Sequence, residues 1–345
     1  MFFLIAEFSQ LFTYMVSPEL EGSIAGLFGQ QLYHVKWEGM HFWDLIQPFF
    51  MFIVAFAMPF SFSRRMAKGD SMPSVTKHVL VRAFLMLFLG WAFYCIGPGK
   101  IMFRFQNVLC QLAVTYLLAF LIIGKARVYQ IGFSVILILV SEGLYRFFPL
   151  DGFNQAFEPG KNFGAWFNIL IAGKEDGGHW AMFNAIPTAA HTIWGVLAGQ
   201  LLMSDRTSMK KLLILIGSGI IGLVIGYGLS PFTPIIKRIS TSSFVFASGG
   251  WSLLALALCY WLIDIKKHQK GVLFFAIIGM NPLFIYLFAH VGGADLIRKI
   301  FLPFSNLLFG WSGDLAAHII LSLNVLSFLW YICYWMYKRK IFIRI

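Results

Sequence analysis

The sequence predicts an all-α polytopic membrane protein, a bundle of about ten transmembrane helices with both termini in the cytoplasm. The chain is 59% hydrophobic and only 12% charged, whereas soluble domains are about 45–50% apolar and about 25% charged. Apolar runs of roughly 18–22 residues recur, and such a run crosses a bilayer as a helix because its backbone polar groups then bond within the run. Lysine and arginine gather at the ends of these runs.

The apolar runs give the expected spans in order: 1–16, 42–63, 78–96, 106–123, 128–148, 183–203, 210–229, 243–264, 271–291 and 315–337. The first run is short for a helix that rises about 1.5 Å per residue. No lysine or arginine precedes Lys36, so this run lacks the basic region of a signal peptide. We interpret it as a first helix without its cytoplasmic end.

Alternate connections between the runs carry unequal basic charge, and the richer set is expected on the cytoplasmic side. This orientation makes residues 1–345 a single transmembrane domain with outer segments at about 17–41, 149–182 and 292–314. Because the basic clusters read as topology signals, the net charge of +12 does not indicate nucleic acid binding.

The densest group of polar residues in the sequence follows the first run and ends inside the second: His34, Lys36, Trp37, Glu38, His41 and Asp44. Asp44 lies about one turn into the second run, where it either caps the helix or orients a histidine. A histidine in an outer loop is either simply solvated or serves as a general base or an acyl-carrying nucleophile.

Four further polar residues lie near the expected membrane boundary or inside a run. Arg104 is at an outer helix end, and Glu142 has Arg146 one turn later as a simple pairing partner. Asn281 and His290 lie along one apolar run, where hydrogen bonding between helices is the plainer alternative. The four cysteines show no metal-ligand spacing, and we expect no metal.

The stretch HVKWEGMHFWDLIQPFFMFIVAFAMPFS, residues 34–61, resembles heparan-alpha-glucosaminide N-acetyltransferase and its bacterial relatives, which share an H-x-x-W-x-G segment followed by D-L-x-x-P-F/W-F. The resemblance continues in the same order along nearly the whole chain, through RAFLMLFLG, RFQNVLCQLAVTY, SEGLY, WGVLAGQLL, the segment from Lys237 to Ser243, GMNPLFIY and YKRKIFIRI.

The resemblance implies a multi-pass enzyme that passes acetyl from cytosolic acetyl-CoA to a terminal glucosamine amine across the membrane. It identifies His34 as the active histidine and gives Asp44, Arg104, Glu142 and Asn281 positions near a central cavity. We expect His34 and Asp44 to be catalytic and six residues to bind the acceptor: Trp37, Glu38, Arg104, Glu142, Asn281 and His290. Four basic residues are expected on the cytoplasmic side of the membrane, and from their charge and this location alone we expect them to contact the CoA phosphates: Arg64, Arg65, Lys125 and Arg127.

The chain also departs from the family pattern. The L-D-x-x-R-G stretch before the first run and the luminal N-terminal domain have no counterpart in these residues, and segment 149–182 is shorter and lacks a Pro-Glu-Gly block. The sequence therefore leaves two alternatives open: an O-acetyltransferase of a cell-envelope glycan, or a solute transporter or flippase. We expect a bacterial inner membrane location, with membrane lipid and a sugar acceptor as partners and a homodimer as an open alternative.

Overall fold

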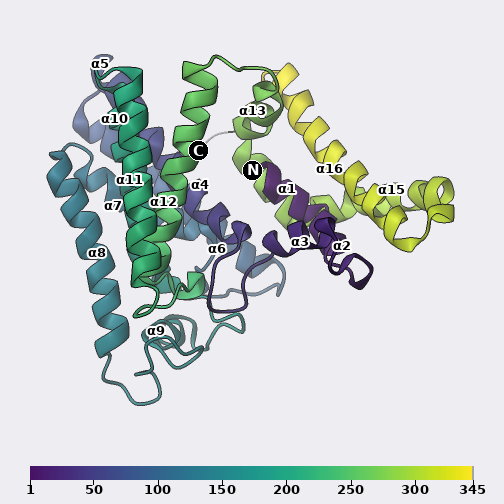
Figure 1. Cartoon of the computed structure of the whole chain (residues 1–345), viewed down its shortest axis with the longest axis horizontal. Coiled ribbons are helices and arrows are strands. Elements are labelled where there is room, and N and C mark those ends of the chain that lie inside the picture. The colour runs from purple at the N-terminus through teal and green to yellow at the C-terminus, as the bar shows by residue number, and fades with distance from the viewer. Residues whose placement is uncertain (344–345) are drawn as a thin grey trace. The chain divides into compact units, whose positions relative to one another are not determined.

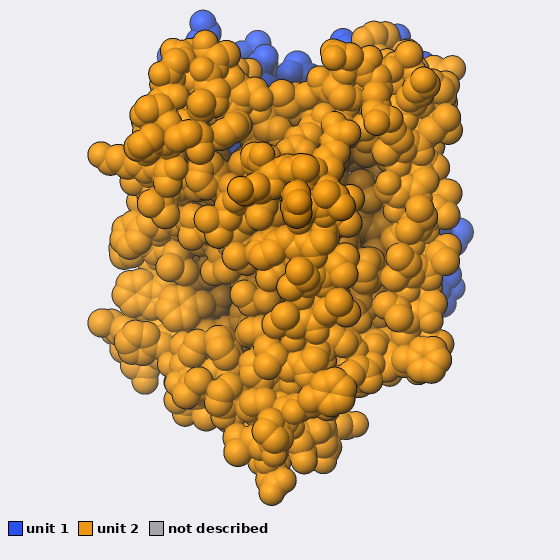
Figure 2. Space-filling model, turned by 90° about the vertical axis from the view of Figure 1, so that its left-hand side faces the viewer, with its two compact units in different colours: residues 1–33, 268–345 blue, residues 34–267 orange. Residues whose placement is uncertain are grey.

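The computed structural model describes residues 1–343, and these form helices joined by loops (Figure 1). They divide into two compact units, which are described separately. Unit 1 comprises Met1–Tyr33 and His268–Ile345, and unit 2 comprises His34–Lys267. Figure 2 shows one face of the molecule with unit 2 in orange. This division concerns packing alone, and the single-domain organisation expected from the sequence stays a prediction.

Unit 2 contains helices α4 (Ile46–Phe56), α5 (Met58–Ala67), α6 (Met72–Ile96), α7 (Val108–Ile122), α8 (Arg127–Phe147), α9 (Phe163–Ala172), α10 (Ala185–Met203), α11 (Ser208–Leu229) and α12 (Ser242–Cys259). Short 3-10 turns η2 (Phe42–Leu45), η3 (Met182–Asn184) and η4 (Lys237–Ile239) and a π-helical end, η5 (Tyr260–Ile265), complete it. Helix α10 is the central element, since it packs against α4, α7, α8 and α12 (Figure 1).

Local sequence explains how neighbouring helices of unit 2 begin and pair. Asn107 caps α7 by accepting a hydrogen bond from the amide of Cys110 at 3.0 Å. The same side chain donates to the carbonyl of Gly90 in α6 at 2.5 Å. One asparagine therefore both starts α7 and joins it to α6.

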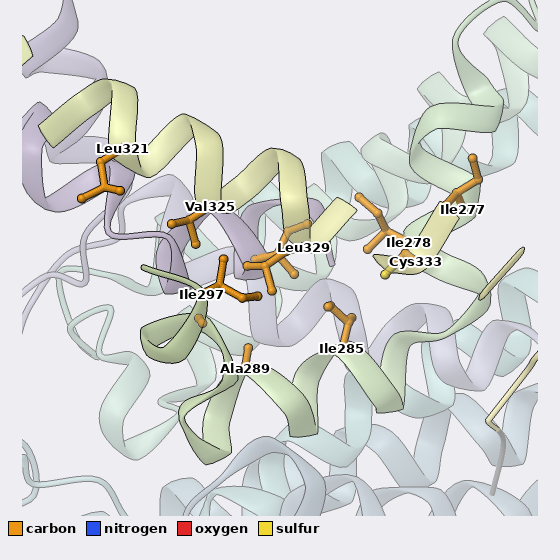
Figure 3. Packing of buried hydrophobic residues seen from close by; sticks show 11 residues of the cluster. Ile277, Ile278, Ile285, Ala289, Ile297, Leu321, Val325, Leu329 and Cys333 are labelled. Atoms are coloured by element: carbon orange, nitrogen blue, oxygen red, sulfur yellow. The ribbon is translucent and has the colours of Figure 1, made fainter. Parts of the chain in front are cut away.

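Unit 1 contains α1 (Phe2–Phe8), α2 (Leu11–Met15), α3 (Ile24–Gln31), α13 (Val272–Met280), α14 (Pro282–Phe288), α15 (Ala294–Phe309) and α16 (Asp314–Lys338), with 3-10 turns η1 (Pro18–Leu20) and η7 (Gly310–Ser312) and a π-helical turn η6 (Ala289–Gly293). Its core forms where Leu321, Val325 and Leu329 of α16 face Ile285 and Ile297, as Figure 3 shows. Ile5 of α1 belongs to the same cluster, so the first and last parts of the chain share one apolar core.

Six helical segments among residues 1–343 are long and apolar enough to cross a membrane: Phe42–Ala67, Met72–Ile96, Arg127–Phe147, Ser208–Leu229, Ser242–Ile265 and Asp314–Lys338. A seventh arises if Val272–Met280 and Pro282–Ser312, which bend by 71° at their junction, form one broken span. The structure therefore supports a polytopic membrane protein, but its count does not match the ten spans expected from the sequence.

The difference in count has a physical reason at each remaining run. The first run breaks into two short helices at Gln10, whose φ of 62° is left-handed. Helix α7 has only 15 residues. Helix α10 has 19 residues but carries polar side chains, including Thr188, His191 and Thr192, that are buried against other helices. The expected outer segments also contain helices of their own, namely α3, α9 and α15.

Candidate active site

Two residues near the start of unit 2, His34 and Asp44, form the centre of the candidate site. His34 Nδ1 lies 2.7 Å from Asp44 Oδ1. Asp44 is 1% exposed, and its Oδ2 accepts hydrogen bonds from the amides of His41 at 2.9 Å and Val35 at 3.4 Å. The sequence left open whether Asp44 caps a helix or orients a histidine. The structure shows both, because Asp44 takes part in the capping box of η2 and also binds His34.

Lys237 of η4 joins this pair from a distant part of the chain. Its Nζ lies 3.7 Å from Asp44 Oδ1 and 3.3 Å from His34 Nδ1, and its side chain is 7% exposed. Sequence reasoning placed Lys237 in a segment with a family counterpart but gave it no role. Burial is what distinguishes this lysine from a solvated one, and no sequence signal shows that burial.

Trp180 covers the histidine and two cations. Its ring meets the His34 ring edge to face at 5.2 Å between centroids. Lys237 Nζ lies 5.5 Å and Arg238 Cζ 5.3 Å from the centre of the Trp180 ring, both within the range of cation–π attraction. Trp180 was not among the residues expected from the sequence.

The protonation of His34 follows from these neighbours. Burial lowers the pKa of the His34 imidazole below its usual value, the hydrogen bond to Asp44 raises it, and the charges of Lys237 and Arg238 lower it again, with a net decrease. A neutral imidazole that donates Nδ1–H to a carboxylate keeps a lone pair on Nε2. His34 is therefore poised to accept a proton at neutral pH.

Arg104 contacts the candidate site indirectly, through the segment that carries Trp180. Its guanidinium pairs with the carboxylate of Asp176, and its Cζ lies 4.8 Å from the ring centre of Tyr94. Asp176 Oδ2 accepts from the amides of Gly178 at 3.0 Å and Trp180 at 3.2 Å. Arg104 and Asp176 thus fix the loop that carries Trp180.

Trp37 and Glu38 differ in how they are held. The half-buried Trp37 donates its indole N–H to the carbonyl of Phe157 at 2.7 Å, and its ring meets that of His179 at 6.1 Å. His179 in turn pairs with Glu175. Glu38 is exposed on the same loop as His34. These contacts join the His34 loop to segment 149–182.

Glu142 fixes the segment that leads to Lys237. Its carboxylate lies 2.5 Å from Arg146 Nε and accepts hydrogen bonds from Thr233 at 2.9 Å and Ser242 at 2.8 Å. Arg146 also donates to the carbonyl of Phe232 at 2.8 Å. The pairing with Arg146 is therefore present, and its structural effect is to hold both ends of segment 230–241 against α8.

Asn281 and His290, which we expected to bind the acceptor, belong to unit 1. Asn281 is fully buried, and its side-chain amide donates to the carbonyl of Ile341 and accepts from the amide of Ile343, both at 2.9 Å. The His290 ring packs on Tyr286 at 4.4 Å between centroids. The Asn281 amide is thus used to hold the C-terminal segment beside the break between α13 and α14.

Replacing Asn281 by Ala is expected to lower the free energy of unfolding by about 1–3 kcal/mol, because the two hydrogen bonds that hold the C-terminal segment to this buried side chain are lost together. Faster proteolytic trimming of the C-terminal residues, together with a lower melting temperature, would show this. Asn306→Ala, at an exposed position of α15, is the matched control. Equal stability of the two variants would contradict the expectation.

The four basic residues expected to contact CoA lie at the ends of α5, α7 and α8. Arg65 pairs with Asp70 at 3.5 Å, and Arg64 and Lys125 are exposed. Arg127 lines a pocket of about 330 Å³ together with Pro59, Phe62, Ser63, Ile123, Gln200, Met203 and Ser204. This pocket offers one cation and several polar groups beside apolar walls, which suits a phosphate joined to a flexible chain.

Among residues 1–343, no group of three or more His, Cys, Asp or Glu side chains is arranged to hold a metal ion. The expected lack of a metal stays a prediction. The described site contains an imidazole, a carboxylate and a buried ammonium.

Fold and site together define a class: a helical membrane protein in which a loop histidine is held by a buried aspartate. No protein-family model matches the chain. It is 24% identical over 384 residues to heparan-alpha-glucosaminide N-acetyltransferase of Homo sapiens, and 23% identical over 381 residues to the Mus musculus protein of that name. Each alignment covers 90% of this chain, and the chain spans about half the length of these curated relatives, 55% and 56%. The chain is a distant homologue of this acetyltransferase family.

Proposed function

We propose that this chain is a transmembrane acetyltransferase that moves acetyl from acetyl-CoA to the amine of a glucosamine-type sugar. The observation that carries the proposal is the 2.7 Å contact between His34 Nδ1 and buried Asp44, which leaves His34 Nε2 as the basic atom. The relatives' names support an N-acetyltransferase, and the acceptor and direction are part of the proposal.

The amine attacks the thioester in its neutral form, and a base is required because the nitrogen becomes positively charged as it bonds to the thioester carbon. His34 Nε2 accepts the proton as the amine nitrogen bonds to the thioester carbon. When the tetrahedral intermediate collapses, the carbon–sulfur bond breaks and the imidazolium returns its proton to the leaving CoA sulfur. The products are an amide and free CoA, and His34 ends in its starting form.

A direct transfer is preferred over an acetyl-histidine route. Both use the same Nε2 atom, but the acetyl-histidine route needs two acyl transfers, with the imidazole as nucleophile. Isolation of a His34 peptide carrying labelled acetyl after incubation with acetyl-CoA alone would overturn the direct route. Its absence, with rapid product formation once the sugar is added, is the expected result.

The proposal includes an orientation in a bacterial inner membrane with both termini cytoplasmic. The pocket that contains Arg127 adjoins α5, α7, α8 and α10. Asp44 lies just before the start of α4, and α4 leads into α5 at its other end. The basic connections favour the cytoplasm for the Arg127 end. Acetyl-CoA would bind there, with Arg127 facing its phosphates, and the acceptor would approach the His34 loop from outside.

Replacing His34 by Ala is expected to reduce CoA release from acetyl-CoA and glucosamine by about 10²–10⁴-fold, the contribution typical of a positioned base. The measurement uses the full chain purified in detergent and a thiol reagent. His78→Ala, at an exposed position of α6, is the matched control. Turnover that survives in His34→Ala would contradict the proposal, and mass spectrometry of the product separates N-acetylation from O-acetylation of a glycan.

The second candidate is a solute transporter, which the 71° break between α13 and α14 favours because broken helices often form substrate sites in transporters. In unit 1, however, the side-chain amide at this break binds the backbone of residues 341 and 343. Saturable binding of a solute without thioester turnover would support transport over transfer.

A further inference from the structure

The ammonium of Lys237 is buried, and this requires compensation by an opposite charge. A lone cation taken out of water is strongly unfavourable, so a lysine with a 7% exposed side chain needs a charged partner. Asp44 provides it at 3.7 Å, and the face of Trp180 provides a second, weaker attraction. Lys237 therefore belongs to the same electrostatic group as His34.

The backbone around Lys237 is tied down, which makes its position a property of the fold. The Lys237 carbonyl accepts the amide of Ser240 at 3.0 Å, and the Ile236 amide donates to Thr241 Oγ1 at 3.0 Å. Asn184 Nδ2 donates to the carbonyl of Arg238 at 2.8 Å. The lysine thus projects from a fixed turn rather than from a freely moving loop.

The distances also select one arrangement of protons. An ammonium has no acceptor, and Asp44 Oδ1 lies near both His34 Nδ1 and Lys237 Nζ. If Nδ1 carried no hydrogen, two lone pairs would face each other across 2.7 Å. Nδ1–H donating to Asp44 avoids this, and Lys237 Nζ then lies at ion-pair distance, 3.7 Å, from the same carboxylate oxygen.

We propose that Lys237 is a positioning residue that neutralises Asp44 and thereby keeps His34 as the neutral imidazole with its proton on Nδ1. Asp44 alone would favour a charged imidazolium, which cannot accept a proton. With Lys237 present, the carboxylate still orients the ring but its charge is balanced. This role rests on the proposed function in one respect: a histidine that acts as a base has to be neutral before it accepts a proton.

The groups that face His34 are Asp44 from η2, Lys237 and Arg238 from η4, and the rings of Trp43 and Trp180. Arg238 is directed elsewhere, because it donates to the carbonyl of Gly178 at 2.6 Å. Of the two cations, Lys237 therefore has the closer contact with the Asp44–His34 pair.

The test measures the titration of His34 itself in the purified full chain. Diethylpyrocarbonate reacts with neutral imidazole, and its pH-dependent addition to the His34 peptide is followed by mass spectrometry. Lys237→Met is expected to raise the apparent pKa of His34 by about one unit or more, because a positive charge near Nδ1 is removed. Lys237→Arg should stay near the wild type, and exposed Lys161→Met should not change the pKa.

An unchanged pKa of His34 in a folded Lys237→Met variant would overturn the proposal. A measurement on the unmodified protein covers the case in which that variant does not fold: nitrogen NMR of labelled histidine should show His34 with Nδ1 protonated and Nε2 unprotonated at neutral pH. The opposite tautomer would equally overturn it. Neither readout needs turnover, so a failed acetyl-transfer assay and a failed role for Lys237 are separate results.

Discussion

Replacing Asp44 by Asn is expected to reduce acetyl transfer by about 10³-fold while leaving the fold intact, within the range that a positioned base contributes. Asparagine keeps the size of the side chain and can still accept the amide of His41, which Asp44 Oδ2 accepts at 2.9 Å. Its amide N–H₂, however, would donate to His34 Nδ1. The imidazole proton would then move to Nε2, the atom that has to accept a proton.

The measurement for Asp44→Asn is the initial rate of CoA release at saturating acetyl-CoA, with the elution volume of the detergent complex as a check on folding. Asp205→Asn, at an exposed position before α11, is the matched control. A rate within a few-fold of the wild type would show that Asp44 serves only to cap η2. A comparable loss in both variants would point to a general charge effect.

Sequence reasoning worked where the information is local. Long apolar runs gave the six candidate spans, with ends close to those of the helices, because each such helix satisfies its backbone within itself. The pairing of Asp44 with a histidine was one of two alternatives, and His34 and Asp44 are only ten positions apart in the chain. That proximity made the pair predictable without knowledge of the rest of the bundle.

Sequence reasoning could not identify the contacts of a residue whose partner is far away in the chain. His34 and Lys237 are separated by 203 positions, and the resemblance alone did not assign the lysine a role. The sequence did not show that the Asn281 amide binds the backbone 60 and 62 positions later, and its expected contact with an acceptor stays a prediction. The sequence shows which residues are polar, but their contact partners depend on how the helices pack.

Replacing Gly195 by Leu is expected to have the largest effect on stability. Gly195 of α10 faces the backbone of α4, and a Cβ there would lie 2.1 Å from the carbonyl oxygen of Phe52. Gly199 lies one turn later and makes a similar approach: a Cβ added there would lie 2.5 Å from the carbonyl oxygen of Phe56. Small residues at such contacts let membrane helices approach closely.

A leucine at position 195 would force α10 away from α4, and backbone atoms cannot rotate aside as a flexible side chain can. Overpacking of a core costs about 1–3 kcal/mol and occasionally more, and we expect the upper end here or loss of the folded protein. Gly217→Leu in α11, where no atom lies within 4 Å of the added Cβ, is the matched control. Thermal unfolding in detergent should separate the two variants clearly. Because α4 follows directly from the turn that carries Asp44, any folded Gly195→Leu protein should also lose acetyl transfer, whereas intact activity would contradict the close packing of these two helices.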